Sequence, residues 1–350
     1  MALTSVPAVA SAVAPPALRL RDALPAAALL LVAYAVVPAF APGYLIEAIL
    51  LPFLALSLAG VGLNLVTGYC GQLSLGSAAF MAVGAFAAYN FDLRLPGLPL
   101  VASIALAALT GAAFGVVFGL PSLRIRGFYL AVSTLAAQFF VQWALTKFGW
   151  FSNDSPSGVI SAPRIEVAGL AFDGPVGRYL FAVTVVLVVT AAAARLVSGP
   201  VGADMIAVRD NETAARVIGV PVLRTKLLAF AASSAIIAVA GVLWAFAYLR
   251  TVEPAGFNLD RSFQILFIVI IGGLASIRGA FLGAGFIVVL PLLLANAASA
   301  LFGGAVDSGT LELVQRILLG LLVILFLVAE PDGLSAVLER VRCRIARSKA

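Results

Sequence analysis

Residues 95–123 read LPGLPLVASIALAALTGAAFGVVFGLPSL, a run without a single charged residue. A second uncharged run covers residues 279–306. The hydrocarbon core of a bilayer is about 30 Å thick, and about 20 apolar residues in a helix are enough to cross it. Each run is therefore long enough to span a membrane with some tilt.

The composition of the whole chain agrees with these runs. Of 350 residues, 63% are hydrophobic and 11% are charged, against about 25% charged in a soluble domain, which excludes a soluble globular protein. The chain has no histidine, so Ser-His-Asp and Cys-His catalysis and His-ligated metals are excluded. Cys70 and Cys343 are too far apart for a CxxC pair or a multi-cysteine zinc site. We expect no catalytic residue, no metal and no cofactor.

The uncharged runs predict an all-α fold, a polytopic transmembrane helical bundle with about ten spans. The expected spans cover residues 24–41, 45–66, 73–90, 98–120, 128–147, 179–197, 227–249, 263–277, 280–302 and 313–329. The transmembrane domain is thus 24–329. It is preceded by a disordered cytoplasmic tail, 1–23, and followed by a basic cytoplasmic tail, 330–350.

The lysines and arginines predict the orientation. With both termini in the cytoplasm, 15 of the 22 cations fall on the inner side, as the positive-inside rule requires. Residues 198–226 then form a cytoplasmic loop and 148–178 an extracytoplasmic loop. The net charge is +6, and the lysines and arginines lie beside apolar runs. This position indicates contact with membrane lipid and not with nucleic acid.

The densest run of small residues is GVGLNLVTGYCGQLSLGSAAF at 60–80. Small residues let membrane helices approach closely, so ordinary packing is one explanation. The run also carries polar groups at membrane depth, where a helix break is tolerated only against protein or a water-filled path. We therefore favour a backbone break beside a substrate pathway, with candidate residues Asn64, Thr67, Gly68, Gly71, Gln72, Ser74, Gly76 and Ser77.

A second feature is DMIAVRDNETAARVIGVP at 204–221, within the cytoplasmic loop. Asp210 or Asn211 can cap a helix, and Gly219 followed by a proline can end it. Acidic residues near a helix start interact with its dipole by about 0.3–1 kcal/mol each. The segment predicts a short exposed helix between two spans.

The small residues of this helix bear on what it contacts. A helix lying on lipid headgroups would present a face of large apolar residues. Ala214 and Ala215 are small instead. They favour insertion into a groove on another protein, where Ala214, Ala215 and Gly219 would be pressed against the partner.

Six segments, in the same order, resemble the LivM-type permease of branched-chain amino-acid ABC importers, and the resemblance runs from about residue 45 to 334. They are GLNLVTGYCGQLSLGSAAFMAVGAFAAY (62–89), LRIRGFYLAVSTLA (123–136), AVRDNETAARVIGV (207–220), KLLAFAASSAIIAVAGVL (226–243), VIIGGLASIRGAFLGA (269–284) and PDGL (331–334). The resemblance implies that the 207–220 stretch is related to the EAA loop, which docks on a cytoplasmic ATPase. The residues it carries over are Arg209, Asp210, Asn211, Glu212, Ala214, Ala215 and Gly219.

The chain departs from the family pattern at two positions. Ser77 stands where the family motif GQxSLGHAAF has a histidine, which excludes a role for that histidine here. Thr213 occupies the position of the acidic residue in the general EAA pattern, with Glu212 one position earlier. In addition, GLASIRGAF (273–281) faintly echoes GQLSLGSAAF (71–80), which hints at the internal repeats common in transporters.

The resemblance implies a permease subunit of an ABC importer in a bacterial inner membrane, forming a path for branched-chain or related hydrophobic amino acids. Its implied partners are a second, LivH-like permease, two cytoplasmic ATP-binding subunits and an extracytoplasmic solute-binding protein. The chain contains no GxxxxGK[ST] phosphate loop, so ATP hydrolysis belongs to other subunits. Import of urea, short amides or aromatic acids remains an alternative.

A secondary transporter driven by an ion gradient is an alternative from another class. It would be expected to place a carboxylate or a histidine within a span. Between the flanks of the ten spans, only Glu47 is acidic, and it lies near an outer end. This alternative is therefore the weaker one.

Overall fold

The structure is a computed structural model. It describes residues 30–122, 128–155, 158–167 and 170–302, together with short pieces at 309–310, 313–314, 317–318, 320–321, 324–325, 333–338 and 340. The expected tail 1–23 and residues 123–127 lie outside the described residues. The tenth expected span, 313–329, and the tail 330–350 are described only in those pieces.

The chain divides into two units, residues 1–40 and 41–350. In the first, the described residues form the π-helical turn η1 (Val32–Val36) and helix α2 (Val37–Phe40). The helices of the second unit are α3 (Gly43–Leu45), η2 (Ile46–Leu50), α4 (Leu51–Asn64), η3 (Leu65–Tyr69), α5 (Ser77–Arg94), α6 (Leu100–Ser122), α7 (Phe128–Lys147), α8 (Pro175–Ser198), α9 (Pro200–Asp210), α10 (Glu212–Val217), α11 (Val222–Val242), η4 (Leu243–Leu249), η5 (Pro254–Phe257), α12 (Leu259–Gly272) and α13 (Ile277–Phe302). The predicted all-α class is confirmed.

Six continuous helical stretches are long and apolar enough to cross a membrane by length and composition, among the described residues. They are Gly43–Tyr69, Leu100–Leu120, Pro175–Ser198, Val222–Leu249, Pro254–Gly272 and Ile277–Leu294. Each overlaps an expected span, although Pro254–Gly272 begins and ends before the expected span 263–277, which runs past the end of α12. Helices α5 and α7 also occupy expected spans, although they are not among these six.

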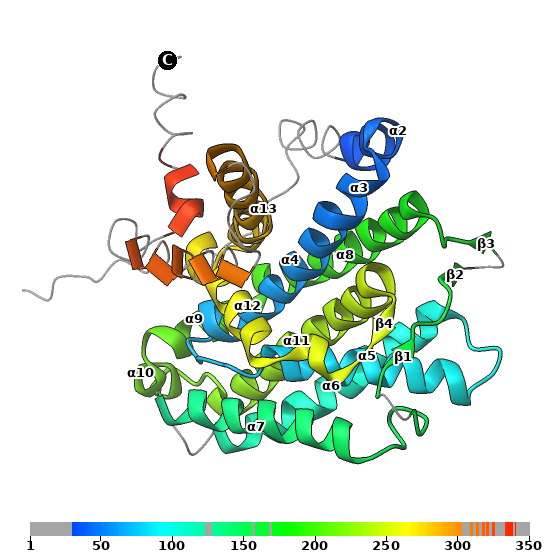
Figure 1. Ribbon diagram of the computed structural model, residues 1–350. Helices are drawn as coiled ribbons and strands as arrows, with labels where there is room; N and C mark the ends of the chain where they lie inside the picture. Colours follow the sequence, from blue (N-terminus) through cyan, green and yellow to red (C-terminus); the bar gives the residue numbers. More distant parts are fainter. Residues whose placement is uncertain are drawn as a thin grey trace, which may run out of the picture. The chain divides into compact units, whose positions relative to one another are not determined.

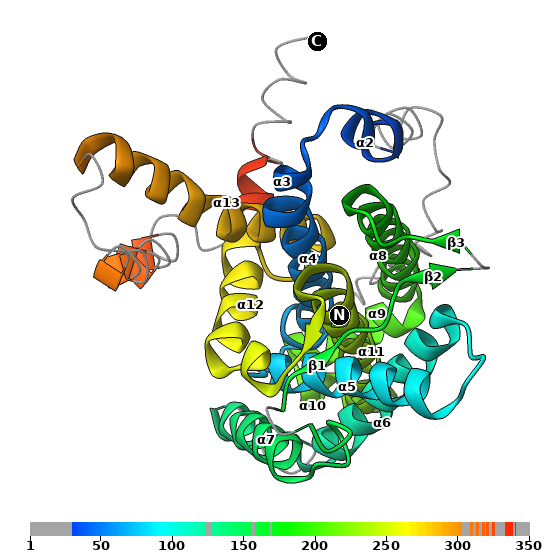
Figure 2. The ribbon, with the colours of Figure 1, turned by 45° about the vertical axis from the view of Figure 1, so that its right-hand side comes forward.

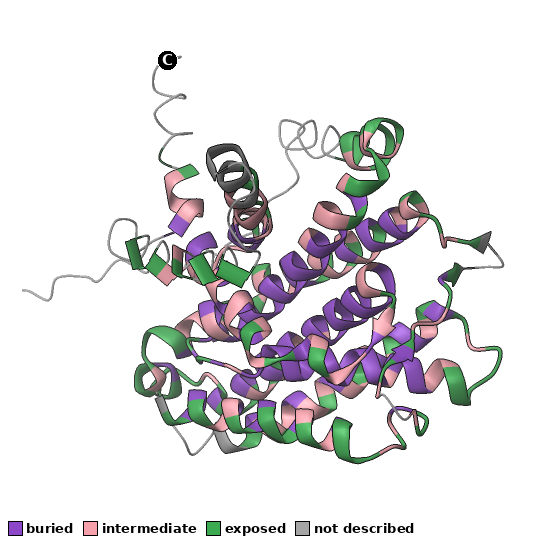
Figure 3. Ribbon diagram, viewed as in Figure 1, coloured by how far each residue is buried: buried purple, intermediate pink, exposed green. Residues whose placement is uncertain are grey.

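Helices α4 and α11 lie at the centre of the second unit. Helix α11 packs against α4, α5 and α6, whereas α4 also packs against α8, α12 and α13 (Figure 1). The view in Figure 2 shows the same neighbours around these two helices. Their residues are mostly buried, while α7 presents many exposed positions (Figure 3). Exposed apolar positions on outer helices are what lipid requires, because hydrocarbon surrounds them in a membrane.

Close approach of backbones holds the centre together. A Cβ atom added at Gly84 of α5 would lie 2.2 Å from the Ala238 carbonyl oxygen of α11, and one at Gly241 would lie 2.0 Å from the Met81 carbonyl oxygen. Only glycine therefore fits at these two crossing points. The Ser233 hydroxyl of α11 donates to the Gly62 carbonyl of α4 at 2.7 Å. Small residues and hydroxyl bonds of this kind are typical of helix packing in membranes.

Two short antiparallel ribbons belong to the segments that connect helices. Strand β1 (Ile160–Ser161) pairs with β4 (Thr251–Val252), with Ile160 opposite Val252. Strand β2 (Glu166–Val167) pairs with β3 (Leu170–Ala171). The first ribbon places the expected extracytoplasmic loop 148–178 beside the connection that follows η4.

Candidate functional site

The predicted break in the glycine-rich segment is present. Helix α4 continues into η3, whose wider turn ends at Tyr69, and residues 71–76 have no helical structure before α5 begins at Ser77. Gly71 has φ +70°, a left-handed conformation that favours glycine. The chain therefore leaves the helix at a position where a residue with a side chain would be strained.

One side of the break is held by the connection between α12 and α13. The Asn64 side chain donates to the Ser276 carbonyl at 2.8 Å and accepts from the Ala275 amide at 2.9 Å. A Cβ atom at Gly68 would lie 2.4 Å from the Ala275 nitrogen. The segment that faintly echoes the glycine-rich run in sequence thus contacts it directly, and it too is a helix break.

The described C-terminal piece reaches the same place. A Cβ atom at Gly333, within the PDGL sequence, would lie 2.5 Å from the Cα atom of Gly273. Gly273 and Gly333 both have positive φ values, 111° and 76°. Three turns from distant parts of the chain therefore meet: the end of η3, the α12–α13 connection and the turn at Gly333.

The other side of the break is held by α7 and α12. The Leu75 amide donates to the Thr134 hydroxyl of α7 at 2.9 Å, and the Ala78 amide donates to the Ser262 hydroxyl of α12 at 2.9 Å. A Cβ atom at Gly76 would lie 2.8 Å from the Thr134 carbonyl oxygen. Thr134 and Ser262 could not be predicted as partners, because isolated hydroxyl residues in apolar spans carry no spacing pattern.

The polar candidates of the break differ in how they are paired. The Thr67 hydroxyl donates to the Gln72 carbonyl at 3.1 Å, and Ser74 is buried. The Gln72 amide and the Ser77 hydroxyl are also buried, and neither side chain has a hydrogen-bond partner within the described residues. Buried polar groups are normally paired, so these two side chains have donor and acceptor atoms that no described residue uses.

The cytoplasmic loop contains two helices, α9 and α10, and the predicted cap and stop of the second are confirmed. The Asn211 side chain accepts from the amides of Thr213 and Ala214 at 3.0 Å each. Helix α10 ends at Val217, and Gly219, two residues further on, has a φ of +90°, a helix-terminating conformation. The Val220 amide then donates to the Ala215 carbonyl at 2.9 Å, closing the end of the helix.

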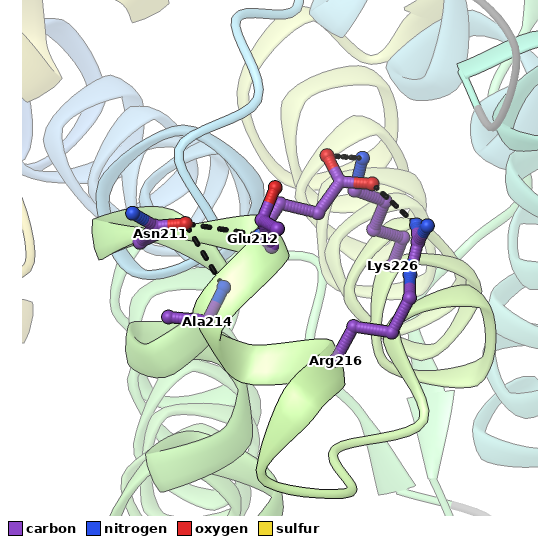
Figure 4. Close-up of polar contacts among 6 residues, drawn as sticks. Asn211, Glu212, Ala214, Arg216 and Lys226 are labelled. Carbon is purple, nitrogen blue, oxygen red and sulfur yellow. Dashed lines mark hydrogen bonds and ion pairs between the residues drawn. The ribbon is translucent and has the colours of Figure 1, made fainter.

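Helix α10 is attached to the start of α11 by an ion pair. Glu212 lies 3.0 Å from the Lys226 ammonium and 3.2 Å from the Arg216 guanidinium. Figure 4 shows the Glu212 carboxylate between these two side chains. The Lys226 side chain is only 8% exposed and Glu212 is 22% exposed, so Glu212 is the counter-charge of a nearly buried cation.

The residues of α10 divide between an inner and an outer side. Ala214 is exposed, but Ala215 is 2% exposed and packs inside the chain. Contrary to the expectation, Ala215 is therefore not available to a partner groove. The exposed surface instead includes Val217 and Ile218, at 83% and 74%. Sequence reasoning missed these two, although large aliphatic residues at the end of a polar helix were a signal that could have identified them.

The helix break at η3 and residues 71–76 contacts the cytoplasmic loop 198–226. The Arg209 guanidinium of α9 donates to the Gly68 carbonyl at 3.2 Å and to the Asp210 carboxylate at 2.9 Å. Cys70 is buried in the turn after η3. The pKa of the Cys70 thiol is raised to about 12, chiefly by burial. The charge of Lys226 acts to lower this pKa, and that of Glu212 acts to raise it. The thiol is therefore mostly protonated and reacts slowly at neutral pH.

Comparison with known proteins adds an independent result. A family model described as "Branched-chain amino acid transport system / permease component" matches residues 45–327. The chain is 31% identical over 300 residues to the "High-affinity branched-chain amino acid transport system permease protein LivM" of Salmonella typhimurium and to the protein of the same name in Escherichia coli. Each alignment covers 79% of this chain and 66% of the relative, so the chain spans just under two thirds of their length.

A third relative carries a different name. The chain is 28% identical over 228 residues to the "Autoinducer 2 import system permease protein LsrC" of an Enterobacter species, covering 64% of this chain and 63% of that protein. No solved structure matches the chain significantly.

Proposed function

Because the chain belongs to the branched-chain amino acid transport system permease family, we propose that it forms the membrane pathway of an importer driven by ATP hydrolysis on separate subunits. It is a multi-pass protein of the inner membrane. Its substrate class is branched-chain or related hydrophobic amino acids, which is supported by the names of the two LivM relatives. A solute-binding protein delivers the substrate, and a second, LivH-like permease completes the pathway.

The proposed topology has ten spans with both termini in the cytoplasm. Two groups of contacts support it. The ribbon of β1 and β4 joins two connections that this topology puts outside. The meeting of Gly68, Ala275, Gly333 and Arg209 joins four segments that it puts inside. A topology with a span added or removed between these segments would place some of them on opposite sides of the membrane.

The exposed residues at the end of α10, Val217 and Ile218, are the proposed contact with the ATPase. Their exposure is the observation on which the proposal rests. Val217 and Ile218 are largely exposed on a loop that the topology puts in the cytoplasm. Water does not favour large aliphatic side chains there, whereas a groove on a partner protein would bury them. Burying such a side chain contributes about 1.5–3 kcal/mol.

The break is the proposed cytoplasmic end of the substrate path. Gln72 and Ser77 are buried polar groups without protein partners among the described residues, beside backbone that is not helical. Irregular backbone at membrane depth is tolerated where it lines a cavity or is covered by protein. Amino acids carry polar groups that could bind to such an amide and hydroxyl.

An ion-coupled secondary transporter is not favoured. Glu47, the acidic residue expected near a span end, forms an ion pair with Arg178, and the same guanidinium donates to the Ala247 carbonyl at 3.0 Å. Arg178 is buried, so Glu47 has a structural role as its counter-charge.

Substitution of the exposed residues tests the proposal. Val217→Asp and Ile218→Asp should each abolish co-purification of the ATPase subunits while the chain still inserts into the membrane. Val159→Asp is the matched control, because Val159 is an exposed valine in the loop proposed to lie outside. If both loop variants retain the ATPase subunits at the wild-type level, α10 is not the contact.

A further inference from the structure

Arg209 points back into its own chain, although the family resemblance places it among the ATPase-contacting residues. Its guanidinium donates to the Gly68 carbonyl, 141 positions away in sequence. Gly68 is in the last turn of η3, where carbonyl groups lack partners within the helix. A cation at a helix C-terminus is favourable, since it binds an unpaired carbonyl and interacts with the negative end of the dipole.

The backbones of the two segments also pack closely at this point. A Cβ atom at Gly71 would lie 2.8 Å from Cγ of Arg209 and 3.3 Å from its Cα atom. With almost no space between them, a movement of the end of α9 toward Gly71 would displace the turn at Gly71 as well. The contact is therefore mechanical as well as electrostatic.

The break is anchored on its far side, which decides what such a displacement would do. Asn64 holds the start of η3 to Ala275 and Ser276, and α4 itself is among the most buried helices. Movement of Arg209 therefore acts on the short stretch between Asn64 and Gly71. This stretch contains a wide π-turn and a left-handed glycine, which are less regular than the helices around it.

We propose that Arg209 is a positioning residue that transmits movement of the α9–α10 loop to the helix break, through its bond to the Gly68 carbonyl and its packing on Gly71. This inference rests on the proposed function. It assigns Arg209 to the link between the loop and the path, whereas Val217 and Ile218 remain the surface that binds the ATPase.

The test uses the complete transporter in proteoliposomes, with three variants. Arg209→Met keeps the length of the side chain and removes its donors, whereas Arg209→Lys keeps one donor for the carbonyl. Arg195→Met is the matched control, because Arg195 is an exposed arginine at the end of α8. The measurements are co-purification of the ATPase subunits, ATP hydrolysis, uptake of leucine, and labelling of Cys70 by N-ethylmaleimide in a Cys343→Ser background.

For Arg209→Met we expect the ATPase subunits to co-purify normally and ATP hydrolysis to continue. Leucine uptake per ATP hydrolysed should be at least about tenfold lower, because loss of a charge-assisted hydrogen bond shifts an equilibrium by about that factor. Labelling of Cys70 should differ between nucleotide-free and ATP-bound states in the wild type and not in this variant. Arg209→Lys should restore much of the uptake per ATP and of the nucleotide-dependent labelling of Cys70. Arg195→Met should behave as the wild type.

Two results would overturn the inference and leave the proposed function standing. One is wild-type uptake per ATP in Arg209→Met, and the other is loss of the ATPase subunits from that variant, which would make Arg209 a docking residue. If the wild-type complex neither binds the ATPase subunits nor takes up leucine, the proposed function fails, and this inference fails with it.

Discussion

Replacing Glu212 by Gln should loosen α10 from α11. Glu212 lies 3.0 Å from the Lys226 ammonium, whose side chain is 8% exposed, so the variant leaves a nearly buried cation without its counter-charge. Breaking a fully buried pair by removing one partner costs about 3–5 kcal/mol. Glu212 itself is 22% exposed, and water near it will weaken the effect, so we expect about 2 kcal/mol.

This change can be measured by hydrogen exchange. The Ala215 amide donates to the Asn211 carbonyl and the Val220 amide donates to the Ala215 carbonyl, each at 2.9 Å, so both report opening of α10. A loss of about 2 kcal/mol corresponds to exchange about 30-fold faster. Amides in the buried part of α11, such as that of Phe230, should not change.

Two controls separate this explanation from a general effect of charge. Asp210→Asn should have little effect, because the Asp210 side chain is 63% exposed and its pair with Arg209 lies at the surface. Glu212→Gln combined with Lys226→Met removes both charges and should restore most of the protection. Exchange at Ala215 and Val220 that rises less than about threefold in Glu212→Gln would refute the reasoning.

Three further predictions address the topology, the break and the thiol. Single cysteines at positions 155 and 335, in a chain without Cys70 and Cys343, should be labelled from opposite sides of the membrane, with position 155 outside; labelling of both from one side would contradict the ten-span arrangement. Gly68→Leu should abolish uptake while the protein remains in the membrane, because a side chain there would collide with Ala275, whereas wild-type uptake would show that the break tolerates bulk. In Cys343→Ser protein, modification of Cys70 by N-ethylmaleimide should be slow at pH 7 and rise about tenfold per pH unit up to pH 10, since its raised pKa of about 12 keeps the thiol protonated; a plateau near pH 9 would indicate an ordinary thiol.

Local patterns in the sequence predicted local structure well. The uncharged runs indicate the helices, and Asn211 and Gly219 indicate the cap and stop of α10, because these depend on a few neighbouring residues. The helix break near Gly68 and Gly71 was also predictable from small and polar residues at membrane depth. Helix α9, by contrast, was part of an expected loop.

Contacts between distant segments were not predictable in the same way. Asn64 bonds to residues more than 200 positions away, and Arg209 bonds to Gly68 across 141 positions. The side of α10 occupied by Ala215 depends on how α10 sits against α9 and α11, which helical spacing alone does not determine. The small residues were therefore expected on the outer surface, whereas the structure places Ala215 inside and Val217 outside.

The most direct test of the proposed function is leucine uptake by the chain reconstituted with its partner permease, its ATPase subunits and its binding protein. We predict that uptake requires ATP inside the cytoplasmic compartment and binding protein on the opposite side, and that an ion gradient across the membrane does not replace ATP. Uptake that an ion gradient drives in the absence of ATP and of the ATPase subunits would contradict the proposed function.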